Sequence, residues 1–203
     1  MINIQAVKVG ILDTNCYIVS GGKDNECVLI DPGEDAAKIQ VKLQALNLSP
    51  VAILLTHAHF DHTKALRNFQ SKECKVYLHP GDEFFIAPEK YQSSIYRKLS
   101  NQIAPDESLY DGQELNLAGL TIKVIHTPGH SGACVCFVLG DNIFSGDTLF
   151  YLSVGRTDLP CGDSVKMKNS LAKLFSLDRD YSVFPGHGEK TSLNFERKNN
   201  PYA

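Results

Sequence analysis

The sequence lacks a long apolar run, a strong net charge and a regular cysteine pattern, and each absence excludes a class of protein. No stretch approaches the roughly 18 apolar residues of a membrane span, and the amino-terminal residues show no basic segment followed by an apolar core. We therefore expect a cytoplasmic protein with no membrane partner. The net charge of −3 comes from 20 basic and 23 acidic side chains, which makes nucleic acid a poor partner and a small molecule the expected one.

The six cysteines include no CxxC pair, which argues against a secreted fold held by disulfides. Cys134 and Cys136 lie two residues apart in an apolar run, where buried and reduced thiols are the favoured interpretation. Hydrophobic residues make up 43% of the chain and charged residues 21%, as in ordinary globular proteins. We expect residues 1–203 to form one domain, present as a monomer or a small homo-oligomer.

Apolar, β-rich segments recur along the whole chain, and most of them end in glycine, proline, aspartate or histidine. These segments predict strands over residues 2–9, 15–20, 26–31, 51–56, 75–79, 120–127, 133–139, 142–147 and 181–186. Apolar residues spaced three and four apart predict helices over 34–47 and 163–177, and a shorter helix over 62–70. The predicted fold class is therefore α+β, with two mixed β-sheets packed together and helices on the outer faces.

The segment from Gly81 to Gly112 has the least periodic pattern in the chain. It carries four aromatic residues among charges, namely Phe84, Phe85, Tyr91 and Tyr96. Two interpretations stay open for it: a flap with a short helix that touches a substrate, or a solvated excursion anchored by a few aromatic side chains.

Histidine and aspartate are concentrated in the heptapeptide THAHFDH, residues 56–62, which follows an apolar strand. His57 and His59 are two residues apart, so in extended backbone both side chains point to the same side. Asp61 and His62 follow at the start of the next helical pattern. Four side chains of the kinds that bind metals can therefore surround one volume, and this arrangement is much rarer than single histidines at strand ends.

Three later segments each place one such side chain after an apolar run and beside glycine, which lets the backbone pass close to a crowded site. They are TPGHSG with His130, FSGDTLF with Asp147 and FPGHGE with His187. The two remaining histidines, His79 and His126, are expected to be structural or to support the site from outside it.

The ligand count predicts a catalytic site with two metal ions. The first ion would be bound by His57, His59 and His130, and the second by Asp61, His62 and His187. Asp147 would bridge the two ions, and each ion would keep an open position. Imidazole and carboxylate without thiolate favour two divalent ions, with zinc preferred and iron or manganese also suitable. Such a pair of cations would hold a bridging water as hydroxide at neutral pH.

These motifs resemble those of the metallo-β-lactamase superfamily, whose HxHxDH motif and later His, Asp and His match this chain in order. The resemblance implies an αββα sandwich with the metals at the strand ends between the two sheets. The run GDTLFYLSVGRTDLPCGD resembles the short glyoxalase II (hydroxyacylglutathione hydrolase)-like type, in which a basic residue at the place of Arg156 helps hold glutathione. A surface ion pair with Asp158 is the alternative for Arg156. Asp147 disfavours the antibiotic-cleaving members, many of which carry cysteine in that region.

The resemblance carries three further expectations. The carboxyl-terminal helical domain that completes the thiol-binding groove in full-length glyoxalase II is expected to be absent. Lys64, where relatives often have glycine, would either add positive charge at the mouth of the site or be solvated. Cys161 stands where glycine is common, which suggests activity that is sensitive to oxidation.

The activity predicted from this resemblance is hydrolysis of a thioester such as S-D-lactoylglutathione by a metal-bridging hydroxide. Asp61 would orient the nucleophile while binding the second metal, and the thiolate would leave without a dedicated acid because its pKa is roughly 8.5. One alternative is a persulfide dioxygenase with a single iron on His57, His130 and Asp147. Lactone or ester hydrolysis is another, and a metal-binding or sensing protein without catalysis is the non-enzymatic alternative.

Overall fold

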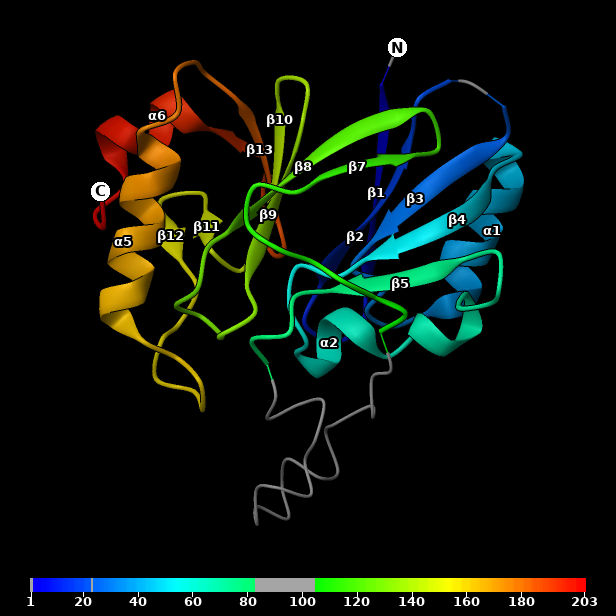
Figure 1. Cartoon of the computed structure of the whole chain (residues 1–203), viewed down its shortest axis with the longest axis horizontal. Helices are drawn as coiled ribbons and strands as arrows, with labels where there is room; N and C mark the ends of the chain where they lie inside the picture. The colour runs from blue at the N-terminus through cyan, green and yellow to red at the C-terminus, as the bar shows by residue number, and fades with distance from the viewer. Residues whose placement is uncertain (1, 23, 83–104) are drawn as a thin grey trace.

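The computed structural model describes residues 2–22, 24–82 and 105–203, and two mixed β-sheets face each other in it (Figure 1). The first sheet has six described strands in the order β1-β2-β3-β4-β5-β6. Their bounds are Asn3–Val9, Thr14–Ser20, Glu26–Ile30, Ser49–Leu54, Lys75–Leu78 and Glu107–Ser108. Strands β1 to β3 pair antiparallel and β3 to β6 pair parallel, so the sheet is mixed.

The second sheet has the order β14-β13-β10-β9-β8-β7 among the described residues. These strands are Thr191–Ser192, Ser182–Pro185, Asn142–Gly146, Val135–Leu139, Leu120–His126 and Glu114–Leu117. Strand β13 runs parallel to β10, whereas the other pairs are antiparallel. A small hairpin, β11 (Leu149–Phe150) and β12 (Ser153–Val154), follows β10.

Helices cover the outer face of each sheet (Figure 1). On the first sheet lie α1 (Ala36–Leu46), the one-turn α2 (Phe60–Thr63) and a 3₁₀ turn over Leu66–Asn68. On the second lie α5 (Ser164–Phe175) and α6 (Leu193–Asn199). The described residues contain no helix long and apolar enough to cross a bilayer.

Three apolar layers hold these elements together, and they explain why the strands have nearly continuous apolar sequences. In β4, Ile53 packs towards α1 while Leu54 packs into the layer between the sheets. In β10, Phe144 joins the layer between the sheets and Ile143 packs towards α5. Strands β4 and β10 therefore bury both faces. The predicted α+β fold of two packed sheets with outer helices is confirmed.

The nine predicted strands and the helices predicted over 34–47 and 163–177 are all present, with ends shifted by a few residues. The helix predicted over 62–70 is instead split into α2 and the 3₁₀ turn. Helix α6 and the short strands β6, β7, β11, β12 and β14 were not predicted. The possible flap with Phe84, Phe85, Tyr91 and Tyr96 lies outside the described residues.

The described cysteines are all free thiols, and Cys134 and Cys136 are buried, as predicted. Burial raises the pKa of the Cys136 thiol to about 11, which keeps it protonated at neutral pH.

Helix α5 begins at a side-chain cap that offers a test of local stability. The carboxylate of Asp163 accepts hydrogen bonds from the backbone N–H groups of Val165 and Lys166, at 2.9 and 3.0 Å. We expect Asp163→Ala to lower the free energy of unfolding by about 1 kcal/mol, because two N–H groups of the first turn lose their acceptor. Urea denaturation would measure the change. Lys168→Ala, on the exposed face of the same helix, should change stability by less than about 0.5 kcal/mol.

Candidate metal centre

The seven side chains singled out in the sequence lie together at one end of the two sheets. His57 and His59 follow β4, and Asp61 and His62 lie in the single turn of α2. The remaining three come from the second sheet: His130 between β8 and β9, Asp147 after β10 and His187 after β13. The centre is therefore built from loops of both sheets.

Distances between ligand-type atoms define two neighbouring clusters. His57, His59 and His130 form one cluster, and Asp61, His62 and His187 form the other. In the first, Nδ1 of His59 lies 2.7 Å from Nε2 of His130. In the second, Nε2 of His187 lies 3.3 Å from Nε2 of His62 and 3.2 Å from Oδ2 of Asp61. The two clusters contain the same residues as the two ligand sets expected from the sequence.

Asp147 reaches both clusters through its two carboxylate oxygens. Its Oδ1 lies 3.4 Å from Nε2 of His62, and its Oδ2 lies 3.4 Å from Nε2 of His130. His57, His62 and Asp147 form a third group of potential ligands that connects the first two. Asp147 is therefore within reach of side chains in both clusters.

The donor atoms fit a metal ion, because some of them are buried without a hydrogen-bond partner among the described residues. Nε2 of His57 and Oδ1 of Asp147 are buried and have no hydrogen-bond partner there. A buried polar atom without a partner is costly, and a bound cation removes that cost. The donors comprise imidazole nitrogen and carboxylate oxygen, which suits zinc, iron or manganese.

Burial and neighbouring charges keep the first cluster in the form that binds metal. Burial, followed by the neighbouring histidines, lowers the pKa of His57 well below its usual value. The same two causes lower the pKa of His59 to about 3, so both rings are neutral at pH 7. Neutral imidazole is the ligand form, and it can coordinate without first losing a proton.

The second cluster has the opposite electrostatic character. Burial lowers the pKa of His62, but Asp147, Asp31 and Asp61 outweigh this effect and raise it to about 10. Burial raises the pKa of Asp61, yet the hydrogen bond from His187 and the charge of His62 bring it below its usual range. The cluster therefore holds a proton that a cation would have to displace.

Hydrogen bonds from the loops orient the candidate ligands. Nδ1 of His130 donates to the carbonyl of Arg156 at 2.7 Å, and Nδ1 of His187 donates to that of Leu12 at 3.0 Å. The hydroxyl of Thr14 donates to Oδ2 of Asp61 at 3.1 Å. Such contacts fix the tautomer and direction of each ligand.

Asp31, at the end of β3, was not singled out in the sequence. It accepts hydrogen bonds from the N–H of Thr56 at 2.8 Å and from the hydroxyl of Thr56 at 2.6 Å. Its Oδ2 also lies 3.0 Å from Nδ1 of His62, so Asp31 contacts the HxHxDH loop at both of its ends. The signal that could have found it is its place directly after the apolar residues CVLI of β3, as for the candidate ligands that follow apolar runs.

Glycine beside the ligands permits close backbone approach, as predicted. A Cβ atom on Gly186 would lie 2.2 Å from Oδ1 of Asp147 and 2.8 Å from the His62 ring. A Cβ atom on Gly146 would lie 2.5 Å from the Thr56 hydroxyl. Neither position leaves room for a side chain.

His79 and His126 stack ring on ring outside the three ligand groups, with centroids 3.9 Å apart. The Nε2 atom of His126 donates to the carbonyl of Gly132 at 2.9 Å, and Nδ1 of His79 accepts from the N–H of Gly81 at 3.1 Å. Burial and the neighbouring His126 lower the pKa of His79 to about 4. Their contacts are those of residues that support a loop, as expected from the sequence.

The other polar residues singled out in the sequence lie at the surface. Arg156 makes a bidentate ion pair with Asp158, with both N···O distances 2.7 Å. Of the two interpretations of Arg156, the structure therefore shows the surface ion pair. The substrate role of Arg156 stays a prediction. Lys64 pairs with Glu34 at 2.6 Å, and Cys161 is exposed.

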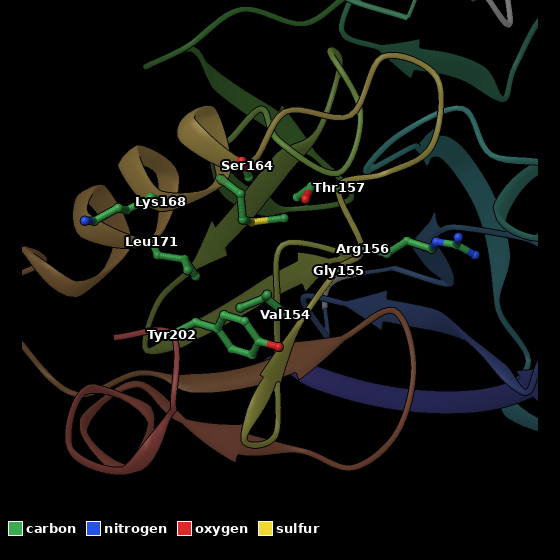
Figure 2. Close-up of a pocket in the computed structure, with 9 residues that line it drawn as sticks. Val154, Gly155, Arg156, Thr157, Ser164, Lys168, Leu171 and Tyr202 are labelled. Carbon is green, nitrogen blue, oxygen red and sulfur yellow. The ribbon is translucent and has the colours of Figure 1, made fainter.

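A cavity of about 390 Å³ lies between the loop that carries Arg156 and helix α5 (Figure 2). Val154, Met167, Leu171 and Tyr202 give it an apolar lining. Figure 2 shows the Arg156 side chain directed away from Leu171 and Tyr202. Because the Arg156 carbonyl accepts from His130, this loop separates the cavity from the candidate centre.

The chain belongs to the metallo-beta-lactamase superfamily, whose family model matches residues 9–187. This membership, together with the relatives below, makes it a metal-dependent hydrolase of a superfamily that typically binds divalent metals.

Two relatives match over nearly their whole length. The probable metallo-hydrolase YqgX of Bacillus subtilis is 35% identical over 204 residues, covering 98% of this chain and 96% of the relative. The hydroxyacylglutathione hydrolase GloC of Haemophilus influenzae is 29% identical over 215 residues, covering 98% and 97%.

Three solved structures share the fold. TTHA1623 in a di-iron-bound form is 38% identical with a TM-score of 0.85, covering 98% of this chain and 100% of that one. The BLEG-1 B3 metallo-beta-lactamase is 33% identical with a TM-score of 0.86, covering 98% and 99%. ETHE1 from Myxococcus xanthus is 26% identical with a TM-score of 0.77, covering 98% and 83%.

Proposed function

We propose that the chain hydrolyses a thioester of the S-D-lactoylglutathione type at a centre of two divalent ions. The observation that carries the proposal is the pair of adjacent ligand clusters with Asp147 within reach of both. The similarity to a hydroxyacylglutathione hydrolase supports the choice of a thioester.

The proposed ligand sets follow the two clusters. His57, His59 and His130 would hold one ion, Asp61, His62 and His187 the other, and Asp147 would contact both. Zinc is the favoured metal, with iron or manganese as alternatives, and the di-iron form of TTHA1623 supports iron. When bound, such ions supply an acidified water and a Lewis acid for the carbonyl oxygen.

The protein's own groups would orient the reactants. Asp61 is ionised at neutral pH because its pKa lies below the usual range, and the Thr14 hydroxyl fixes one of its oxygens. Its carboxylate can therefore accept a hydrogen bond from the attacking water and direct a lone pair towards the substrate carbonyl. The leaving group is a thiolate with an ordinary pKa of about 8.5, so no side chain has to protonate it.

The expected partners belong to the same proposal. The substrate would be a small thioester, held in part by Arg156 after its ion pair with Asp158 opens. Both side chains of this pair are exposed to solvent, where an ion pair is weak, so a substrate carboxylate can compete with Asp158. We further propose one domain over residues 1–203, a monomeric or small homo-oligomeric state, a cytoplasmic location, and no nucleic-acid or membrane partner.

Two rival activities have to be distinguished from the proposed thioester hydrolysis. The likeness to the BLEG-1 B3 metallo-beta-lactamase makes β-lactam hydrolysis the main rival within the same chemistry. The dioxygenase with a single iron, which the sequence resemblance raised as an alternative, is the rival from another reaction class. In that case His57, His130 and Asp147 alone would bind the metal.

Metal content and turnover measured on one preparation test the proposal. We expect close to two metal ions per chain and hydrolysis of S-D-lactoylglutathione, with a β-lactam, a lactone and glutathione persulfide with oxygen as parallel substrates. Removal of the metal by a chelator should abolish turnover, and added zinc should restore it. A single iron with oxygen uptake, or a β-lactam turned over faster than the thioester, would overturn the proposed substrate.

A further inference from the structure

Asp82 is a fully buried carboxylate that the proposed chemistry does not use. It follows β5, and its side chain has no exposed surface. Burial raises the pKa of Asp82, and the hydrogen bonds that it accepts from Ala133, Ala58 and Ser131 oppose that rise. A buried carboxylate is costly unless its oxygens are satisfied, so its partners show what it holds in place.

All three partners belong to the loops that carry the first ligand cluster. Oδ2 of Asp82 accepts from the N–H of Ala58 at 3.1 Å and from the hydroxyl of Ser131 at 2.9 Å. Oδ1 accepts from the N–H of Ala133 at 2.8 Å. Ala58 stands between His57 and His59, and Ser131 directly follows His130. One carboxylate thus ties together the loops of all three histidines.

Beside Asp82, the chain at Gly81 and the His130 loop approach each other backbone to backbone. A Cβ atom on Gly132 would lie 2.3 Å from the carbonyl oxygen of Gly81, and a Cβ atom on Gly81 would lie 2.3 Å from that of Gly132. The His130 loop therefore packs directly against the backbone of Gly81, next to Asp82. The hydrogen bonds to Asp82 hold the loop of His57 and His59 at a fixed distance from the loop of His130.

The second cluster is oriented by other groups. His62 contacts Asp31, His187 contacts the Leu12 carbonyl, and Asp61 accepts from Thr14. None of these contacts involves Asp82. Asp31 also holds Thr56, whose hydroxyl lies 3.0 Å from Nδ1 of His57, so Asp31 serves both clusters, whereas the hydrogen bonds of Asp82 go to the loops of the first cluster.

We propose that Asp82 is a positioning residue for the cluster of His57, His59 and His130, and that losing its carboxylate weakens metal binding there while sparing Asp61, His62 and His187. The inference rests on the metal-binding part of the proposed function and is independent of the substrate.

Asp82→Asn tests the inference with nearly unchanged shape. An amide nitrogen cannot accept a hydrogen bond, so either Ala133 or both Ala58 and Ser131 lose their acceptor, and the loop that carries them shifts. The full-length chain is stripped of metal and titrated with Co²⁺, followed by absorption, and with Zn²⁺ in competition with a chromophoric chelator. His59→Ala and His187→Ala identify which binding step belongs to which cluster.

We expect Asp82→Asn to weaken the step that His59→Ala removes by about 10- to 100-fold, as for other groups that orient metal ligands. The step that His187→Ala removes should change less than about threefold. Ser131→Ala deletes one donor to Asp82 and should weaken the same step to a smaller extent. This milder variant carries the test if Asp82→Asn does not fold.

Glu196→Gln is the matched control. Glu196 is also fully buried and accepts from the Leu152 N–H, the Thr191 hydroxyl and the Asn200 amide, at 3.0, 2.6 and 2.8 Å. Its replacement should lower the melting temperature and leave both binding steps unchanged. Equal weakening of both steps in Asp82→Asn, or no weakening, would overturn the inference. Wild-type protein that binds no ion at the cluster of three histidines would overturn the metal centre itself.

Discussion

Replacing Asp61 by asparagine is expected to lower kcat by about 10²- to 10⁴-fold while the chain stays folded. The change removes a negative charge and one acceptor at the point where Oδ2 of Asp61 meets Nε2 of His187, 3.2 Å apart. Asparagine has nearly the same volume as aspartate, so packing around α2 is preserved. The rate would be measured on whichever substrate the wild-type protein turns over fastest, with metal content and circular dichroism recorded beside it.

Thr14→Val is the graded companion of this experiment. It keeps the shape of the side chain and deletes only the hydroxyl that donates to Asp61 at 3.1 Å. Asp61 remains charged but less well oriented, so a loss of about tenfold is expected. If Asp61→Asn turned over at a rate close to wild type, Asp61 would have no part in orienting the nucleophile.

Gly186→Ala is expected to abolish metal binding and to lower kcat/KM by more than about 100-fold. The added methyl group would lie 2.2 Å from Oδ1 of Asp147 and 2.8 Å from the His62 ring. The backbone cannot yield easily, because the Gly186 N–H donates to Gly146 at 2.8 Å and its carbonyl accepts from Asn15 at 2.7 Å. The two ligand side chains must therefore move instead, and displacements of about 1 Å are enough for losses of this size.

Gly188→Ala separates this effect from backbone strain. Gly188 has a φ of +78°, and among the described residues beyond its two chain neighbours no atom lies within 4 Å of the place where its Cβ would stand. Alanine there is strained but touches nothing, so we expect about 1 kcal/mol of lost stability with metal content unchanged. Equal metal content in both variants would show that the ligands tolerate the methyl group at Gly186.

The layered fold was predictable because its largest elements carry their own apolar pattern. Ile39 and Leu43 of α1 are four residues apart and both are buried, as the helical pattern requires. Helix α6 escaped prediction because its buried residues are Leu193 and Glu196, and a buried glutamate breaks the apolar stripe. Strands of two residues, such as β6 and β14, exist only through pairing with a neighbour.

The candidate ligands were predictable because histidine at a strand end is rare, whereas aspartate is common in ordinary turns. Asp82 therefore gave no comparable signal, and Asp31 gave only its place after the apolar residues of β3. Asp82 acts across 24 residues to Ala58 and 49 residues to Ser131. Contacts at such separations depend on how the sheets pack, which spacing along the chain does not reveal. The ligand roles of the seven residues stay predictions until metal binding is measured.

The division of the centre between two sheets has a consequence for how the protein matures. During synthesis His57 to His62 emerge first, long before the ribosome reaches His187, so a nascent chain presents an incomplete set of imidazoles. The set is completed only when the sheets dock, with the Tyr17 hydroxyl donating to the Pro185 carbonyl at 2.6 Å. If the centre binds metal as proposed, its full ligand set would exist only at the end of maturation, and the ion would act as a removable cross-link whose binding energy adds to the stability of the docked state.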